Sequence, residues 1–561
     1  MKDIVKRLVN AKAEDTIRLA KDIWSFAELS YEEYKSAAVL KEALVKEGFV
    51  IDDGIAGIPT AFTATYKVGS GRPVMALLAE YDALDGLSQQ AGLTEPEPVV
   101  PGGAGHGCGH NLLGAGCYSA AVLKEALVKE GFVIDDDIAG IPTAFTATYK
   151  VGSGRPVMAL LAEYDALDGL SQQAGLTEPE PLVPGGAGHG CGHNLLGAGC
   201  YSAAVALKDY LVENKLDGSV VFFGCPAEEG AGSKQFIARA GYFDDVDFAY
   251  TWHPSTVNEV ASKGSVAIMG ANFVFDGISS HAGGSPHLGR SALDAVELMN
   301  VGVNYMREHM IDAARVHYAY SDAGGTAPNV VQSHAVIKYE VRAPKVSQVQ
   351  ELFARVVDIA KGAALMTGTR MTFEITMAFS DYTPNKTLAA VMDECLQELG
   401  APDWDEADYD MAARMLRSYN KNTLSNIKES LKEFFDREDI TDILEKPLDK
   451  DVHPFNPREF RYESGSTDVG DVGYATPTVM LYVTTACLGN VDHTWQNTSF
   501  SCSPVGMKGM LKAAEVMTLA CIKTMQQPEL IEKAKAELKK KNGGKYVCPL
   551  PDYTQPPIGK Y

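Results

Sequence analysis

The sequence predicts an α/β protein: a larger domain with a central sheet flanked by helices, and a smaller α+β domain inserted into it. Apolar strands alternate with amphipathic helices in the first half of the chain, and polar side chains follow the strands directly. After about residue 264 the order becomes strand-helix-strand-helix-strand, which is typical of a split βαβ, ferredoxin-like domain. We therefore divide the chain into residues 1–263, 264–384 and 385–561, with the first and third parts forming one domain.

Length, composition and charge agree with this division and exclude several classes of partner. The chain has 561 residues, too many for one ordinary domain. Its 46% hydrophobic and 22% charged residues are typical of a globular protein. A net charge of -23 argues against nucleic acid and anionic membrane partners. We find no secretory h-region and no apolar run long enough to span a membrane. Ten cysteines without framework spacing suggest a reduced, cytoplasmic protein.

A tandem duplication interrupts the first part of the chain. Residues 36–118 recur as residues 119–201 with two differences, Gly54 against Asp137 and Val99 against Leu182. Only one copy can fill the corresponding place in a single sheet. Residues 31–49 read as one continuous helix, and residues 194–215 read as a helix that leads into the next strand. We therefore expect the helix of the first copy and the glycine-rich loop of the second copy to be used in the fold.

The glycine-rich loop, Gly-His-Gly-Cys-Gly-His-Asn, carries the first candidate ligands. Cys191 and His193 offer the sulfur and nitrogen atoms that zinc prefers, but two ligands alone do not define a site. Cys108 and His110 occupy the same positions in the first copy, so the sequence leaves open which pair is used.

Further candidate ligands follow other strands. Glu228 and Glu229 follow a buried strand, where a carboxylate pair needs a partner, an ion or water. His253 and His493, each ambiguous alone, also come where a strand ends or shortly after one. Together these residues suit a hydrolytic site with two ions and one unligated carboxylate, Glu228. The full ligand set is Cys191, His193, Glu229, His253 and His493.

Three polar residues stand out in the inserted domain. His281 lies at a polar strand-to-helix junction and could simply begin a helix. Arg342 could be an ordinary surface residue, although a guanidinium suits bidentate recognition of a substrate carboxylate. Asn329 lies between them in a loop-like segment.

The motifs GHGCGHN, PAEEG, TWHPS, SSHAGGSP, GGTAPNVV, YEVRAP, GSTDVGD and DHTWQ, in this order, resemble those of the M20 family of metallopeptidases and amidohydrolases. The resemblance implies a catalytic α/β domain around two divalent ions, zinc or manganese, and a lid domain that also mediates dimerisation. It implies that Glu228 deprotonates the attacking water and passes the proton to the leaving amine. It further implies that Asn329 and Arg342 hold the carboxylate side of the substrate, and that His281 reaches the site of a neighbouring subunit.

The expected function is hydrolysis of the amide bond of an N-acyl or N-aminobenzoyl amino acid, a p-aminobenzoyl-glutamate-like small molecule with a carboxylate. A homodimer is expected, and an assembly that also contains a second kind of subunit is the alternative. One alternative is a dipeptidase or N-acyl-amino-acid hydrolase with the same fold. Another is a metal-binding dimer that the duplication has disabled, although the unligated Glu228 favours the enzyme because a structural metal site needs no free carboxylate.

Overall fold

The fold is described from a computed structural model. It describes residues 123–556, apart from positions 125, 142, 184, 460 and 464, together with two short strands of the first copy. These strands, β1 (Val50–Asp53) and β2 (Phe62–Thr65), pair with each other in a small antiparallel sheet of their own.

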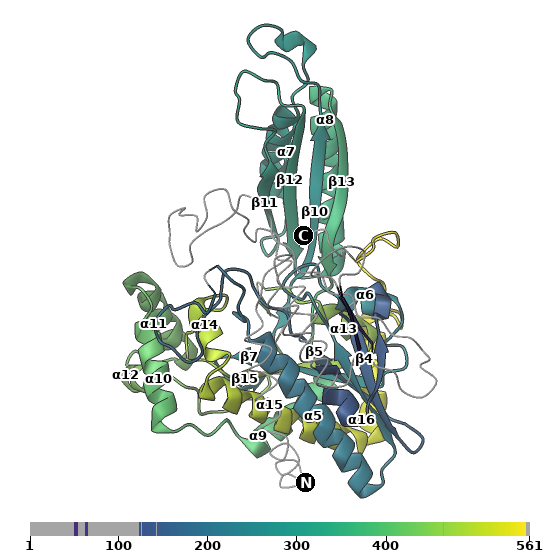
Figure 1. The fold of residues 1–561 in the computed structure, drawn as a ribbon, viewed down its shortest axis with the longest axis vertical. Helices are drawn as coiled ribbons and strands as arrows, with labels where there is room; N and C mark the ends of the chain where they lie inside the picture. Colours follow the sequence, from purple (N-terminus) through teal and green to yellow (C-terminus); the bar gives the residue numbers. More distant parts are fainter. Residues whose placement is uncertain are drawn as a thin grey trace.

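A seven-stranded mixed sheet forms the centre of the large domain (Figure 1). Its strand order is β3-β4-β6-β5-β7-β15-β8, and the central strands β6, β5, β7 and β15 run parallel. Parallel strands are covered on both faces, which explains why β6 is buried along its whole length and reads as a continuous apolar run. The strands are β3 (Val133–Asp136), β4 (Phe145–Val151), β5 (Val157–Ala162), β6 (Gly218–Gly224), β7 (Phe248–Ser255), β8 (Glu259–Val260) and β15 (Thr478–Thr484).

Helices cover both faces of this sheet, which confirms the α/β prediction. In β5, Leu160 and Ala162 face one core, which α5 (His193–Asn214), α9 (Lys386–Leu399) and α15 (Pro504–Met525) complete. Ala159 and Leu161 face the opposite core, which contains residues of α6 (Lys234–Arg239) and α13 (Val469–Ala475). This alternation is the period-two pattern of a strand buried on both sides.

Helix α5 is long and apolar enough to cross a membrane by composition, but 89% of its apolar window is buried inside the fold. It is a core helix of the large domain. Further elements around this domain are α16 (Pro528–Asn542), the short parallel strand pair β9 (Gly264–Ser265) and β14 (Tyr462–Glu463), and a 3-10 turn at Ile138–Gly140.

The small domain extends from the large domain as an elongated arm (Figure 1). Its antiparallel sheet has the order β11-β12-β10-β13, and two helices pack together against it. The chain order is β-α-β-β-α-β, so the split βαβ, ferredoxin-like prediction is confirmed. The elements are β10 (Ala267–Asp276), α7 (Ala292–Met306), β11 (Arg315–Asp322), β12 (His334–Ala343), α8 (Val346–Thr367) and β13 (Arg370–Phe379), with 3-10 turns at Pro286–Leu288 and Arg307–His309.

The sequence analysis missed strand β11. It is an edge strand in which Val316 is the one buried residue, so its sequence lacks the alternation of a half-buried strand. The division of the chain at residues 263 and 384 stays a prediction, although the two sheets are separate.

A group of helices between β13 and β15 builds a third core on the large domain. It contains α10 (Glu406–Arg417), α11 (Lys421–Phe435) and α12 (Thr441–Glu445). Their apolar residues pack against Cys487, Leu488 and Phe500, the last of which belongs to α14 (Trp495–Phe500). We call α10, α11 and α12 the helical insert.

The second copy of the duplication fills the sheet, which differs in part from our expectation. Its helical residues Leu123 and Leu127 are buried in the core beside α5, and its β4 pairs with β6 along seven residues. The helix of the first copy lies outside the described residues. The physical reason is contiguity: the helical segment continues directly into β3 and β4, and Phe132 contacts the ring of Tyr149 at 5.5 Å between centroids. The second copy therefore packs as one unit.

The duplication supplies its own control for this assignment. Phe145 in β4 is fully buried and stacks on Phe222 and Tyr164. Phe145→Ala should lower the free energy of unfolding by about 3–5 kcal/mol because it leaves a cavity. Phe62→Ala, the same change in the first copy, should cost far less because β2 lies outside this sheet. Urea unfolding of both variants checks this, and equal losses would contradict the assignment.

Candidate metal centre

The candidate ligands converge at the carboxyl ends of the parallel strands. Cys191 and His193 lie where the glycine-rich loop enters α5, and Glu229 follows β6. His253 lies near the end of β7, and His493 precedes α14. Strand ends of this kind gather at one edge of an α/β sheet, which is why residues so distant in sequence meet here.

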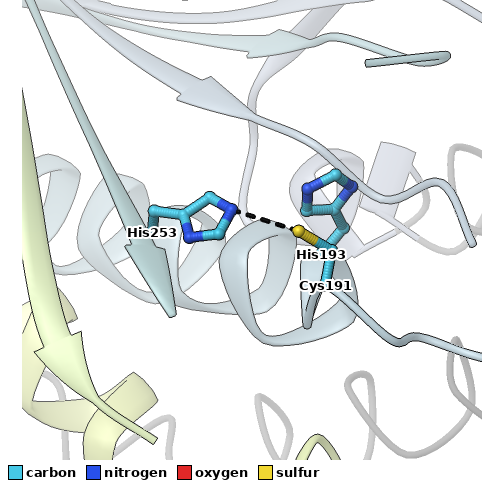
Figure 2. Close-up of side chains that lie close together, drawn as sticks. All are labelled: Cys191, His193 and His253. Atoms are coloured by element: carbon cyan, nitrogen blue, oxygen red, sulfur yellow. Dashed lines mark hydrogen bonds between the residues drawn. The ribbon is translucent and has the colours of Figure 1, made fainter. Parts of the chain in front are cut away.

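Among the described residues, three overlapping groups of side chains could each hold a metal ion. In the first, Cys191, His193 and His253 place their ligand atoms within 4.8 Å of one another. Figure 2 shows the thiol of Cys191 pointing at the ring of His253, with 3.4 Å between Sγ and Nε2. In the second group, Cys191 joins Glu229 and His493, again within 4.8 Å. In the third group, His193 joins Glu163 and Glu228 within the same distance. Cys191 belongs to the first two groups, so its sulfur lies where two ions could share a ligand.

The tautomer of His253 follows from its surroundings. Its Nδ1 lies 2.7 Å from the carbonyl oxygen of Pro254, and a carbonyl can only accept a hydrogen bond. The proton on Nδ1 is therefore held by the carbonyl, and Nε2 is the ring atom that faces Cys191. A ring fixed in this way is prepared to bind a cation.

Asp165, which the sequence analysis did not single out, orients two ligands at once. Its Oδ1 accepts a hydrogen bond from His193 Nδ1 at 2.8 Å, and its Oδ2 accepts one from the backbone N–H of Glu229 at 2.9 Å. A carboxylate behind a ligating imidazole is the usual outer partner of a metal-bound histidine. Two carboxylates, Glu163 and Asp165, follow β5 directly, and this pattern could have revealed Asp165.

The residues present fit divalent ions. Within the described part of the chain, His193 Nε2 and Glu229 Oε1 are buried and form no hydrogen bond, and each has an ionic neighbour at 3.3 Å, Glu163 and His493 respectively. Unsatisfied buried polar atoms cost free energy, and a cation between them would remove that cost. A thiolate, imidazoles and a carboxylate form a donor set that suits zinc.

The electrostatics of the centre also favour a bound cation. Burial and the neighbouring carboxylates of Glu163 and Glu229 raise the pKa of Glu228 well above its usual range. Burial likewise raises the pKa of the Cys191 thiol, and Glu229 adds to the effect. The carboxylate of Glu229, 3.3 Å from its Nε2, raises the pKa of His493. A divalent cation acts in the opposite direction on the acids, because it stabilises the carboxylate and the thiolate.

A buried ion network lies beside the centre. Lys234 Nζ is 2.7 Å from Glu163 Oε1 and 2.5 Å from Asp468 Oδ1, and all three side chains are at most 3% exposed. Asp468 Oδ2 also accepts hydrogen bonds from the backbone N–H groups of Ser233 and Lys234, each at 2.9 Å. Asp468, the first Asp of the GSTDVGD motif, therefore holds the ammonium group of Lys234, which balances the charge of Glu163. Sequence reasoning missed Lys234, because a single lysine reads as a surface residue.

The polar residues of the small domain lie in two different places. Arg342 is at the end of β12 nearest the large domain, where its guanidinium lies 3.3 Å from Ser466 Oγ and 3.5 Å from Glu340 Oε2. His281 and Asn329 are exposed at the opposite end of the arm, where the N–H of Ala282 bonds to the carbonyl of Asn329 at 2.9 Å. The structure thus brings His281 and Asn329 near each other, but places them at the end of the arm far from the metal ligands.

The alternative ligands Cys108 and His110 lie outside the described residues. The second copy supplies the residues that contact His253 and Asp165.

Comparisons with known proteins give the family. The model of peptidase family M20/M25/M40 matches residues 159–522. The chain is 41% identical to a subunit of the p-aminobenzoyl-glutamate hydrolase of Escherichia coli, over 78% of this chain and 92% of that protein. It is 29% identical to the Xaa-Arg dipeptidase of Mus musculus, over 71% of this chain and 78% of that protein.

A solved structure shares the fold. It is that of a putative aminohydrolase from methicillin-resistant Staphylococcus aureus, with a TM-score of 0.51 at 14% identity. The match covers 94% of this chain and 100% of that one. The family model spans most of the large domain and all of the small domain, and the expected resemblance is confirmed. The chain belongs to peptidase family M20/M25/M40, a family of hydrolases that act on amide bonds.

Proposed function

We propose that this protein is a two-metal amidohydrolase that releases a carboxylate-bearing amino acid from an N-acyl or N-aminobenzoyl group, with p-aminobenzoyl-glutamate as the model substrate. The observation that carries the proposal is the position of Cys191 in two overlapping ligand groups, with Glu228 beside them and in neither. Glu228 belongs to a third group with Glu163 and His193, and we assign it the base because Lys234 already neutralises Glu163. The 41% identical relative is named for the hydrolysis of p-aminobenzoyl-glutamate.

In this proposal Cys191, His193, Glu229, His253 and His493 hold two divalent ions. Bound ions would polarise the scissile carbonyl and make water acidic enough to react near neutral pH. Glu228 takes the proton of the attacking water at its carboxylate and then delivers it to the leaving amine nitrogen. Asp165 keeps His193 and the backbone of Glu229 in place during both steps. A thiolate ligand favours zinc over manganese.

Substrate recognition is assigned to the small domain. The guanidinium of Arg342 faces the large domain and can bind a carboxylate through two parallel hydrogen bonds. His281 and Asn329 lie at the opposite end of the arm from Arg342, so we assign them to the active site of a second copy. His281 of the partner subunit would stabilise the oxyanion, and Asn329 of the partner subunit would help to hold the substrate.

A homodimer is therefore the proposed working unit, and we propose that it works in the cytoplasm. A second kind of subunit is also proposed, because the relative in Escherichia coli is named as one subunit of its hydrolase and a different chain of that organism is named as another. The second candidate activity is that of a dipeptidase, which the similarity to the Xaa-Arg dipeptidase favours. Parallel assays with p-aminobenzoyl-glutamate and with dipeptides distinguish the two activities.

Glu228→Gln tests the role of the general base. The amide keeps the shape of the side chain but cannot accept the proton, so kcat should fall by about 10²–10⁴-fold. Metal content, measured by elemental analysis after dialysis, should stay at the wild-type value because Glu228 is not a ligand. A variant with wild-type kcat would refute the assignment.

Cys191→Ala and Cys108→Ala test which copy supplies the centre. The first variant should lose metal and activity, because it removes the ligand shared by both groups. The second should keep about two ions per chain, the number that a two-metal site needs. If Cys108→Ala were the variant that lost metal, the first copy would supply the site. Near-zero metal in the wild type would favour a disabled protein.

Arg342→Met tests carboxylate recognition. Hydrogen bonds to charged groups contribute about 1.5–3 kcal/mol, so KM for p-aminobenzoyl-glutamate should rise about tenfold or more. Arg315→Met is the matched control, because Arg315 pairs with Arg342 across the sheet and bonds only to the carbonyls of Asp312 and Ala314 among the described residues. Steady-state kinetics of both variants decide the matter, and an equal rise in KM would exclude a specific role for Arg342.

A further inference from the structure

The two loops that carry Cys191 and His493 are joined at one carbonyl group. The carbonyl of Gly190, directly before Cys191, accepts a hydrogen bond from the backbone N–H of His493 at 3.0 Å. The same oxygen accepts a second hydrogen bond from the side-chain amide of Asn497 at 2.6 Å. The distance between these two loops is therefore set by atoms that are not themselves candidate ligands.

His493 needs such support because its backbone is strained. Its φ of 57° is in the left-handed region, which residues other than glycine rarely adopt. A conformation of this kind persists only where the surrounding structure holds it. Hydrogen bonds that fix the segment around His493 therefore also fix the direction of its side chain.

A chain of hydrogen bonds runs from Asn497 to the helical insert. Asn497 Oδ1 accepts from Asn490 Nδ2 at 2.8 Å, and Asn490 Oδ1 accepts from the hydroxyl of Tyr419 at 3.0 Å. The oxygen of Tyr419 also accepts from the backbone N–H of Val491 at 2.9 Å. Each amide in this chain thus uses its donor on one side and its acceptor on the other, so every link depends on the next.

Tyr419 lies between α10 and α11, outside the seven-stranded sheet, and its ring packs against the core of the helical insert. A neighbouring contact, from Gln496 Nε2 to Ser418 Oγ at 3.2 Å, joins the same two segments. Burial raises the pKa of Tyr419 to about 12, so its hydroxyl keeps the proton that it donates to Asn490. The ring is thus anchored on one side and the hydroxyl bonded to the loop on the other.

We propose that Tyr419 is a positioning residue of the metal centre, which holds His493 relative to Cys191 through Asn490 and Asn497. The helical insert is then a brace for the site and not only an addition to the surface. The inference rests on the proposed ligand roles of Cys191 and His493. The ion whose binding depends on Tyr419 is the one that Cys191, Glu229 and His493 would hold.

Tyr419→Phe removes one hydroxyl and leaves the ring in place. Asn490 Oδ1 then loses its donor and Val491 N–H its acceptor. Loss of a group bonded directly to a metal ligand typically weakens metal binding 10- to 100-fold, and Tyr419, which acts through Asn490 and Val491, should have an effect near the lower end. We expect one of the two zinc ions to bind about tenfold more weakly or worse in competition titrations with a chelator. We expect kcat to fall while KM changes less than twofold.

The control is Tyr409→Phe. Tyr409 packs against the same core, and its ring lies 4.9 Å from Lys446 Nζ. Within the described residues no hydrogen bond joins its hydroxyl to the loops of Cys191 or His493. This variant should bind both ions as the wild type does. Asn490→Asp is a second variant: it keeps the acceptor for Tyr419, removes the donor to Asn497, and should weaken the same ion.

The outcomes separate the brace from the proposed function. Weaker binding of one ion in Tyr419→Phe and Asn490→Asp, with metal-free unfolding temperatures like that of Tyr409→Phe, supports the brace. Wild-type affinity in Tyr419→Phe overturns it, as does an equal loss in Tyr409→Phe, which would indicate general destabilisation. A wild-type protein that binds no zinc would instead refute the proposed function, and the brace with it.

Discussion

The carboxylate of Asp165 is the interaction on which the geometry of the metal centre depends. It receives one hydrogen bond from the ring of His193 and another from the backbone of Glu229. These residues follow different strands, so one buried carboxylate fixes the entry to α5 against the exit of β6. The position of Asp165 is itself fixed by β5, which lies between β6 and β7 in the sheet. The order of the strands in the sheet therefore determines where the candidate ligand atoms of His193 and Glu229 lie.

So many buried carboxylates at one sheet edge need compensation. Glu163, Asp165 and Asp468 are at most 4% exposed, and a buried charge is tolerated only when it is paired and hydrogen-bonded. Lys234 supplies a permanent positive charge on one side, where it joins Glu163 to Asp468. On the other side the compensation is left to imidazoles and, in our proposal, to metal ions. The carboxylates next to Lys234 are therefore already paired with a positive charge, whereas those on the other side of the site can still bind cations.

The sequence revealed more of the site than of its support. Strand and helix patterns predicted the large sheet. Glu229, His253 and His493 at or after strand ends, with Cys191 and His193 in the glycine-rich loop, were grouped as one candidate set, and the resemblance to a family supplied their roles. Local sequence patterns are enough for this grouping, because the carboxyl ends of parallel strands lie at one edge of the sheet however the side chains pack. Lys234 and Asp468 are 234 residues apart in sequence, and Tyr419 lies 71 residues from Asn490. Neither pair has a local pattern, so only the folded chain shows the contacts. Strand β11 was missed because most of its side chains face solvent.

The occupation of the sheet by residues 119–201 has a genetic consequence. The contacts described for the seven-stranded sheet and for the candidate metal centre use this copy, whereas β1 and β2 pair with each other and with no other described strand. Because the copies differ at only two of 83 positions, a crossover between them could remove one copy. The product would be a 478-residue chain in which the remaining copy keeps the sequences that now precede and follow the pair. The duplication is thus reversible in a single recombination event.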